Sequence, residues 1–422
     1  MKRPFDDLIR LDGPIITTPL GIDFYKFTMG RAVIERHPEV PVTYRLVNRT
    51  TDVRLADIID EAELRCQLNH ARQLHFNNSE LHYIRGTNEY GERMFPPGYL
   101  YFLENQYRLP DYSLSVQDGQ FDLTFSGPWV QTIYWETIAL SIINELYYRA
   151  LMRELTPFQR ESIIANGVHR LQQKVRVLKQ RPDITVVEFG TRRRFSRAWQ
   201  RYINQVLAEE LDSQFRGTSE TSIAMELGLL PMGTYAHEMD MVYSGIFHDS
   251  DDAIRSSHRR VLYDWWDTYG EGLSIALPDT YGSDFFLQDF PREMAHNWKG
   301  MRHDSGDPIA FGEKVIKFYE SHGIDPRSKM IIFSDGLTLP VILMIADHFR
   351  GRIKYSFGWG TNLTNDLGFK ALSLVVKVVE ANGHGTVKLS DNRAKAIGKS
   401  EDIERFSRIF GYTATLNEKC TY

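Results

Sequence analysis

Segment 301–308, MRHDSGDP, places Arg302, His303 and Asp304 directly after a short apolar run. A guanidinium can bind phosphate or carboxylate oxygens through paired hydrogen bonds. A fixed carboxylate can stabilise positive charge that develops on a sugar. The same residue types also form ordinary surface loops. The segment therefore suggests an active-site edge that handles a phosphorylated sugar, but its composition alone does not exclude a simple turn.

A histidine stands in a second polar segment, GTYAHEMD at 233–240, which contains His237 and Glu238. Three roles suit His237: a structural histidine, a metal ligand, or a nucleophile that accepts a phosphoryl group. The HExxH spacing of zinc hydrolases is absent. The residues by themselves leave the choice open.

Glycine-rich loops offer places for an anion. FGWGTN at 357–362 places Gly358 and Gly360 before Thr361. FSDG at 333–336 likewise ends the preceding predicted strand with a glycine. Glycines let backbone N–H groups approach an anion, and a following helix N-terminus favours negative charge. The triplet at 192–194 can add guanidinium groups, although three arginines are also typical of a solvated helix start.

These segments need a scaffold that brings strand ends together. From residue 184 onward, short apolar runs alternate with helical segments, which predicts parallel pairing. The runs are ITVVEFG (184–190), LLPMGT (229–234), LSIALPD (273–279), WKGMRH (298–303), MIIFSDG (330–336) and IKYSFGWG (353–360). Nearly every run ends in polar or glycine residues, and the carboxyl ends of barrel strands carry the chemistry. We therefore favour an α/β barrel over a doubly wound sheet.

The N-terminal part is mixed. Residues 41–48 alternate as a strand does, residues 55–74 predict an amphipathic helix, and residues 112–127 predict a hairpin that turns at Asp118-Gly119. A helix is expected over 130–153, and Thr156-Pro157 suits the start of the next one.

Composition sets the outer limits. The chain has 422 residues, 42% of them hydrophobic, and a net charge of −5. A large core is possible, and nothing in the charge favours nucleic acid or membrane binding. Cys66 and Cys420 are the two cysteines, so neither a disulfide framework nor a zinc site is expected. No signal peptide or membrane-spanning run is visible, and we expect a cytoplasmic protein.

Motifs in one consistent order, from residue 23 to about residue 398, resemble the nicotinate phosphoribosyltransferases of bacteria and fungi. They are DFYKFTMG, YRLVNR, EFGTRRRFS, GTSE, PMGTYAHE, ALPDTYGSDFFLQDF, GMRHDSGDP, KVIKFYESHGIDP, IIFSDGL, FGWGTNLTND and VVEANG with VKLSD. The resemblance implies the type II phosphoribosyltransferase fold. An irregular α/β barrel (131–370) would pack on an N-terminal α+β domain (1–130), to which the C-terminal segment (371–422) returns.

The resemblance also implies a reaction. Nicotinate and 5-phosphoribosyl 1-diphosphate would give nicotinate mononucleotide and pyrophosphate, the first step of NAD synthesis from nicotinate. ATP hydrolysis would be coupled through a phosphohistidine at His237, and Mg²⁺ would accompany the substrate phosphates. No resident metal is expected. The pyridine nitrogen is already a nucleophile, so no general base is needed.

Roles follow for the matching residues. Phe189 and Tyr25 would stack on the two faces of the pyridine, with Tyr25 delivered by a partner subunit, which implies a homodimer with shared active sites. Arg302 would lie near the base and ribose, and Asp304 and Asp279 near the sugar. The phosphate-binding residues would be Arg192, Asp335, Gly336, Gly360 and Thr361, together with Lys377, Lys388 and Lys395 from the neighbouring chain.

Ser219 is the residue expected to decide between nicotinate and nicotinamide, because nicotinamide-using relatives are expected to carry an aspartate at this position. A hydroxyl can donate to the carboxylate of nicotinate, whereas an aspartate would repel it. Glu220 and Met239 depart from the usual asparagine and tryptophan, and Glu220 is expected to point away from the substrate. The alternatives are a nicotinamide-using enzyme, a non-catalytic relative, or a metal-dependent barrel hydrolase that uses His237, Glu238, His303 and Asp304.

Overall fold

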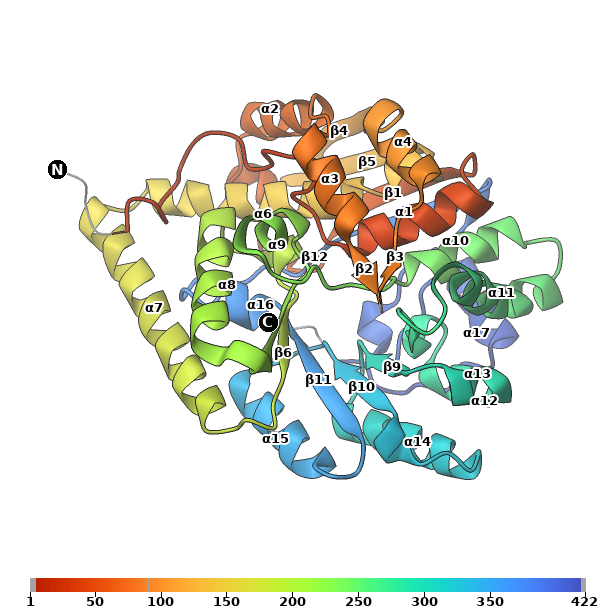
Figure 1. Cartoon of the computed structure of the whole chain (residues 1–422). Coiled ribbons are helices and arrows are strands. Elements are labelled where there is room, and N and C mark those ends of the chain that lie inside the picture. The colour runs from red at the N-terminus through yellow and green to blue at the C-terminus, as the bar shows by residue number, and fades with distance from the viewer. Residues whose placement is uncertain (1–4, 90, 419–422) are drawn as a thin grey trace.

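Two sheets organise the chain in the computed structural model, which describes residues 5–89 and 91–418 (Figure 1). The larger sheet has six parallel strands in the order β7-β6-β11-β10-β9-β8. They are β6 (Val186–Glu188), β7 (Phe215–Thr218), β8 (Ile275–Ala276), β9 (Gly300–His303), β10 (Met330–Phe333) and β11 (Lys354–Trp359). Among the described residues no ladder joins the edge strands β7 and β8, so the predicted α/β barrel is an irregular one.

Helices connect these strands and pack around them (Figure 1). They are α7 (Pro157–Lys179), α8 (Arg197–Leu211), α9 (Thr221–Leu227), α10 (Glu238–Ile246), α11 (Asp251–Tyr269), α12 (Ser283–Asp289), α13 (Arg292–Asn297), α14 (Pro308–Ser321), α15 (Leu339–Phe349) and α16 (Thr361–Thr364). Caps fix several starts. Thr156 and Gln159 form a capping box before α7, and Asp307 accepts the Ala310 N–H at α14. Because α14 begins directly after 301–307, its cap helps to hold that polar loop.

An antiparallel sheet in the order β13-β12-β1-β5-β4 lies above the barrel in Figure 1. Its strands are β1 (Pro41–Asn48), β4 (Tyr112–Gln117), β5 (Gln120–Pro128), β12 (Leu374–Ala381) and β13 (His384–Gly385). The helices beside it are α1 (Tyr25–Arg36), α2 (Glu61–Arg72), α3 (Asn78–Gly86), α4 (Pro97–Asn105), α5 (Trp129–Thr132) and α6 (Trp135–Arg153). β12 follows the barrel in sequence but pairs with β1, so late residues return to the N-terminal sheet. The expected domain boundaries themselves stay predictions.

Short elements complete the chain. They are β2 (Asn88–Glu89), β3 (Glu92–Arg93), α17 (Ser400–Ile409) and the 3₁₀ turns η1 (Leu55–Asp57), η2 (Thr191–Arg193), η3 (Asp212–Gln214), η4 (Pro278–Thr280), η5 (Pro326–Ser328) and η6 (Arg393–Lys395). One continuous apolar core runs under both sheets and includes Trp129, Trp199 and Trp359. Burying each large apolar side chain stabilises the fold by about 1.5–3 kcal/mol.

One predicted strand is wrong. The run 229–234 forms only an isolated bridge, between Thr218 and Pro231, and the strand at this place in the sheet is β7. Pro231 has no N–H to donate to a ladder. Gly217, at φ +133°, brings the chain so close to the Leu230 carbonyl that a side chain would not fit. The helix expected over 130–153 is also divided into α5 and α6.

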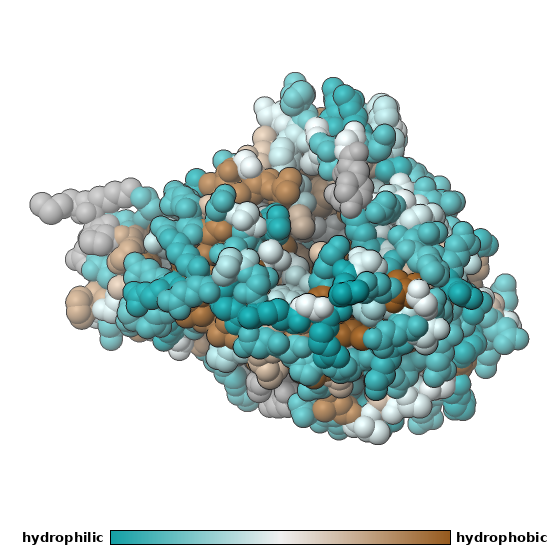
Figure 2. Space-filling model, turned by 60° about the horizontal axis from the view of Figure 1, so that its bottom comes forward, coloured by the Kyte–Doolittle hydropathy of each residue, from teal (hydrophilic) through white to brown (hydrophobic). Residues whose placement is uncertain are grey.

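The surface seen in Figure 2 is mostly hydrophilic, and the apolar residues on it lie in separate small groups. No helix within residues 5–89 and 91–418 combines the length and apolar character that crossing a bilayer requires. Cys66 is exposed, and Cys420 lies outside the described residues.

Candidate active site

A cavity of about 370 Å³ collects the polar strand ends predicted from the sequence. Its walls include the ends of β6, β9, β10 and β11, and residues of α1 and β12 close it from the side of the antiparallel sheet. The expected site residues that line it are Tyr25, Phe189, Arg192, Ser219, His237, Arg302, Asp304, Asp335, Gly336, Gly360, Thr361, Lys377, Lys388 and Lys395. Segment 301–308 is thus part of a cavity wall rather than a simple surface turn.

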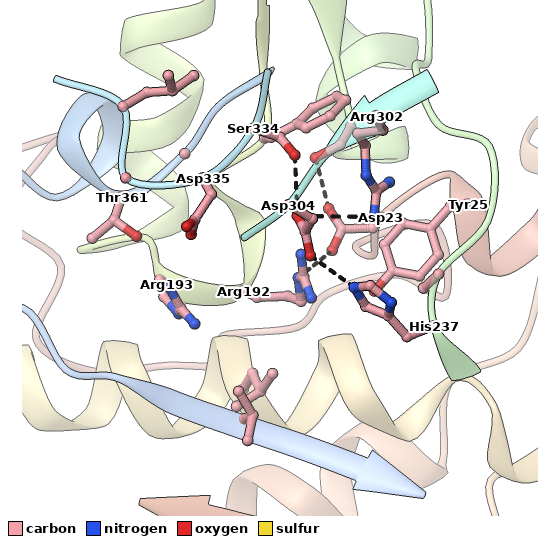
Figure 3. A pocket seen from close by; sticks show the side chains of 18 of the residues that line it. Asp23, Tyr25, Arg192, Arg193, His237, Arg302, Asp304, Ser334, Asp335 and Thr361 are labelled. Carbon is pink, nitrogen blue, oxygen red and sulfur yellow. Dashed lines mark hydrogen bonds and ion pairs between the residues drawn. The ribbon is translucent and has the colours of Figure 1, made fainter. Parts of the chain in front are cut away.

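His237 lies in the loop that enters α10, beside Asp304 (Figure 3), and its Nε2 atom meets two charged groups. The distance from Nε2 is 2.9 Å to Asp304 Oδ2 and 2.8 Å to Lys388 Nζ. The ring is 3% exposed. Burial lowers the pKa of His237 to about 4, with Lys388 acting in the same direction, so the imidazole is neutral at pH 7.

Asp304 is ionised although it is largely enclosed. Burial raises the pKa of its carboxyl, but Arg302, His237 and Lys388 together hold it well below its ordinary value. Ser334 also donates a hydrogen bond to Asp304 Oδ1, at 3.0 Å. The carboxylate is therefore a fixed negative charge at the cavity wall.

Asp279 is the one expected site residue that is absent from the cavity wall, and its place beside the sugar stays a prediction. It is 1% exposed and lies beside His237 and Lys388, with 3.6 Å from Oδ1 to the imidazole Nε2 and 3.4 Å from Oδ2 to Lys388 Nζ. Ser305 donates to the same carboxylate. Asp279 therefore contacts two residues of the cavity wall, His237 and Lys388.

Tyr25 reaches the cavity of its own chain, so its side chain is already placed there without a partner subunit, and its delivery by a partner stays a prediction. Its hydroxyl donates to Glu136 Oε2 at 3.0 Å, and the Arg192 guanidinium lies 5.7 Å from the ring centre. The expected lysines also belong to the same chain: Lys377 pairs with Glu136, and Lys395 with Asp335. The pairing of β12 with β1 explains this, because it folds both ends of the sequence over the barrel. The homodimer itself stays a prediction.

The arginine triplet divides its roles. Arg192 lies 3.5 Å from both Asp23 Oδ2 and Glu136 Oε1, and Figure 3 shows it turned toward that side of the cavity. Arg193, which had no separate role in the sequence prediction, lies on the side of Asp335 and Thr361 in the same view. Arg194 is fully buried beside Glu145 and Glu220.

The prediction for Glu220 is confirmed, whereas the one for Gly358 is not. Glu220 caps α9 and points away from the cavity, as expected. Gly358, by contrast, packs against the Phe189 ring, where a Cβ atom would lie 2.3 Å from a ring carbon. It makes room for that ring rather than for an anion.

The Ser219 hydroxyl, which was expected to donate to the carboxylate of nicotinate, already donates to another group of the protein. It donates to Asp23 Oδ1 at 2.6 Å, so a carboxyl already occupies this corner of the cavity. Burial raises the pKa of Asp23, and Arg192 partly offsets this effect. Asp23 had no predicted role, although it opens the DFYKFTMG motif two residues before Tyr25, and that position was the available signal.

The residues of the hydrolase alternative do not converge. The Glu238 carboxylate turns away to Lys26, Tyr44 and Trp129, and His303 Nε2 lies 3.1 Å from the Gly306 carbonyl. The groups that do converge are His237, Asp279 and Asp304, whose possible ligand atoms lie within 4.8 Å of one another. Lys388 already contacts all three side chains.

Comparison with known proteins gives the same picture. Residues 184–414 match the nicotinate phosphoribosyltransferase family model, and residues 20–144 match the model of its N-terminal domain. A nicotinate phosphoribosyltransferase structure from Porphyromonas gingivalis is 30% identical, with a TM-score of 0.85 over 94% of this chain and 100% of that one. One from Vibrio cholerae is 30% identical, with a TM-score of 0.84 and 95% of each chain covered. One from Saccharomyces cerevisiae is 28% identical, with a TM-score of 0.84 over 96% of this chain and 100% of that one.

Fold and site together define an α/β-barrel enzyme of the type II phosphoribosyltransferase architecture. The chain belongs to the nicotinate phosphoribosyltransferase family.

Proposed function

We propose that this chain joins nicotinate to phosphoribosyl diphosphate and couples the transfer to ATP through His237. Family membership supports the general reaction. The observation that supports the coupling is the cluster of His237, Asp304 and Lys388 at the cavity wall, where a neutral imidazole nitrogen lies between a carboxylate and an ammonium group.

Transfer of the sugar requires little acid–base chemistry. The pyridine nitrogen would form a bond to C1 of the ribose as the bond from C1 to the diphosphate oxygen breaks and pyrophosphate leaves. Phe189 and Tyr25, both at the cavity wall, are proposed to hold the pyridine ring, with Arg302 near the base and ribose. Positive charge that develops on the ribose would be stabilised by the fixed Asp304 carboxylate.

The phosphate groups need compensating positive charge. Lys377, Lys388 and Lys395 line the cavity and are proposed to face the diphosphate. The 5′-phosphate is proposed to bind Arg192, with the loops at Asp335-Gly336 and Gly360-Thr361. Mg²⁺ prefers oxygen ligands, and the partly exposed carboxylates of Asp304 and Asp335 fit that preference. When bound, the ion would neutralise charge on the diphosphate.

ATP coupling follows from a nucleophilic imidazole. His237 Nε2 would form a bond to the γ-phosphorus of ATP as ADP leaves, and water would later release phosphate. The phosphoryl group adds negative charge and acceptor oxygens beside Lys388. We propose that this group tightens binding of phosphoribosyl diphosphate and that its hydrolysis loosens the site for product release.

Labelling with γ-³²P ATP tests the coupling. Wild-type protein should take up an acid-labile, base-stable label, and the His237→Asn variant should take up none while it retains slow transfer without ATP. His258→Asn is the matched control, because His258 is also buried and bonded to a carboxylate, that of Asp289. A His237→Asn variant that is labelled like wild type, or that still responds to ATP, would refute the proposal.

A further inference from the structure

A single hydroxyl group links His237 to a carboxyl that plays no part in the proposed reaction. Thr280 Oγ1 lies 2.9 Å from His237 Nδ1 and 3.0 Å from Asp240 Oδ2. All three side chains are buried, and Asp240 is 7% exposed. The contact lies on the side of the imidazole opposite to Asp304 and Lys388, which both meet Nε2.

The hydroxyl has one hydrogen to donate, and an ionised carboxylate can only accept. When Thr280 donates to Asp240, the contact with His237 requires a hydrogen on Nδ1. Nε2 then carries a lone pair, which can accept a hydrogen bond from Lys388. Asp304 favours the other tautomer, with the hydrogen on Nε2. The two sides of the ring therefore compete for the position of one hydrogen.

We propose that Asp240, acting through Thr280, is a positioning residue that holds His237 in the tautomer with its hydrogen on Nδ1, so that Nε2 is kept as the phosphoryl acceptor. The inference rests on the proposed function of His237. A phosphoryl acceptor must offer a lone pair, and Nε2 is the nitrogen that faces the Lys388 ammonium group.

No cation faces Asp240 within the described part of the chain. Its titratable neighbours are Asp279 and Tyr281, at the turn η4, and Tyr235 and His237, ahead of α10. Burial raises the pKa of Asp240 to about 7. A protonated Asp240 can donate to Thr280, whose own hydrogen then turns to Nδ1. The productive tautomer should therefore be lost as the pH falls through about 7.

Nitrogen-15 NMR of histidine-labelled protein reads the tautomer directly, and the signals missing from His237→Asn identify those of His237. At pH 8, wild type and Thr280→Ser should show hydrogen on Nδ1. Thr280→Val, which keeps the shape but loses the hydroxyl, should show it on Nε2. An unchanged tautomer in Thr280→Val would overturn the inference.

The rate of labelling from γ-³²P ATP gives a second, functional readout. Thr280→Val should be labelled roughly ten- to hundredfold more slowly than wild type, and Thr280→Ser should recover most of the rate. The wild-type rate should rise with pH around a midpoint near 7, and this midpoint should be absent in Asp240→Asn. Asp264→Asn is the control, because Asp264 is another carboxylate bonded to a buried hydroxyl of α10, that of Tyr243.

The two proposals fail separately. If wild type takes up no label, the proposed coupling fails. The tautomer of His237 measured by NMR then still tests whether Asp240 and Thr280 hold the hydrogen on Nδ1. If wild type is labelled but Asp240→Asn keeps the same pH midpoint, the role of Asp240 is refuted and the coupling stands.

Discussion

Burial acts on His237 and Asp304 in opposite ways, although the two side chains touch. It lowers the pKa of the histidine to about 4, because the charged imidazolium is poorly solvated there. It would raise the pKa of the aspartate, but Arg302, His237 and Lys388 more than compensate. The site thus keeps a neutral nucleophile beside a fixed negative charge at neutral pH. This combination is what the proposed chemistry requires of these two residues.

Substrate choice can be tested at Ser219, whose hydroxyl donates to Asp23. Ser219→Asp would place a second carboxylate in this corner, and repulsion should raise the KM for nicotinate at least about tenfold, while use of nicotinamide should not worsen. Ser219→Ala is the neutral control and should have a smaller effect. An equal rise in the KM for nicotinate and for nicotinamide would show that Ser219 does not distinguish the carboxylate of nicotinate.

The buried carboxyl of Asp240 should reduce stability in a pH-dependent way. Its pKa rises from 3.8 to about 7 on folding, so the unfolded chain releases this proton first and stability falls as the pH rises from about 4 to 7. Asp240→Asn should therefore raise the melting temperature at pH 8, with a gain that disappears toward pH 4. Calorimetric melts across this range measure it. A gain of the same size at both ends would contradict the assignment.

Residue types identified part of the cavity wall, and the family resemblance supplied the rest, including Tyr25, Phe189 and Ser219. Residue types predicted the residues at the strand ends, because Arg, His and Asp directly after an apolar run are unusual for a plain turn. Arg302 to Asp304 are the example. Residue types did not single out Asp23 or Arg193, whose roles depend on which way each side chain turns. Asp279 also follows a strand but is buried beside His237, and its residue type could not predict that burial.

Helix α6 supports the site through one buried carboxylate. Glu136 accepts from Lys26, Lys377 and Tyr25 and lies near Arg192, so it ties α1 and β12 to the arginine loop. These cations hold the pKa of Glu136 well below its ordinary value despite its burial.

Removing that charge should loosen the whole arrangement. Glu136→Gln leaves buried cations uncompensated and should lower the free energy of unfolding by about 3–5 kcal/mol. Glu154→Gln is the control, because Glu154 is an exposed glutamate directly after the end of the same helix. Urea unfolding measures both variants. A loss for Glu136→Gln no larger than that for Glu154→Gln would contradict the supporting role.

Elements with a local cause were predicted well. Alternation fixed β1 at 41–48, and the Asp118-Gly119 turn of the hairpin has the expected positive φ angles, 51° and 74°. The error at 229–234 arose at Pro231, which has no N–H to donate to a ladder, so that only an isolated bridge forms beside β7. The pairing of β12 with β1 joins segments more than 300 residues apart, and no local pattern specifies its register.

At the scale of the molecule, one chain brings residues of its N-terminal part and of its barrel to the same cavity. Tyr25 and Asp304 line the same cavity, so a mixed dimer of Tyr25→Ala and Asp304→Ala would have one defect in each site. We expect no recovery of activity in verified mixed dimers. Recovery would show that a neighbouring chain completes the site and would restore the shared-site hypothesis.

The most direct test of the account is a product assay on the purified wild-type protein with phosphoribosyl diphosphate, Mg²⁺ and either nicotinate or nicotinamide, with and without ATP. We predict that nicotinate mononucleotide and pyrophosphate form in equal amounts, that ATP accelerates their formation, and that nicotinamide is used far more slowly. Absence of product from nicotinate, or comparable turnover of nicotinamide, would contradict the proposed function.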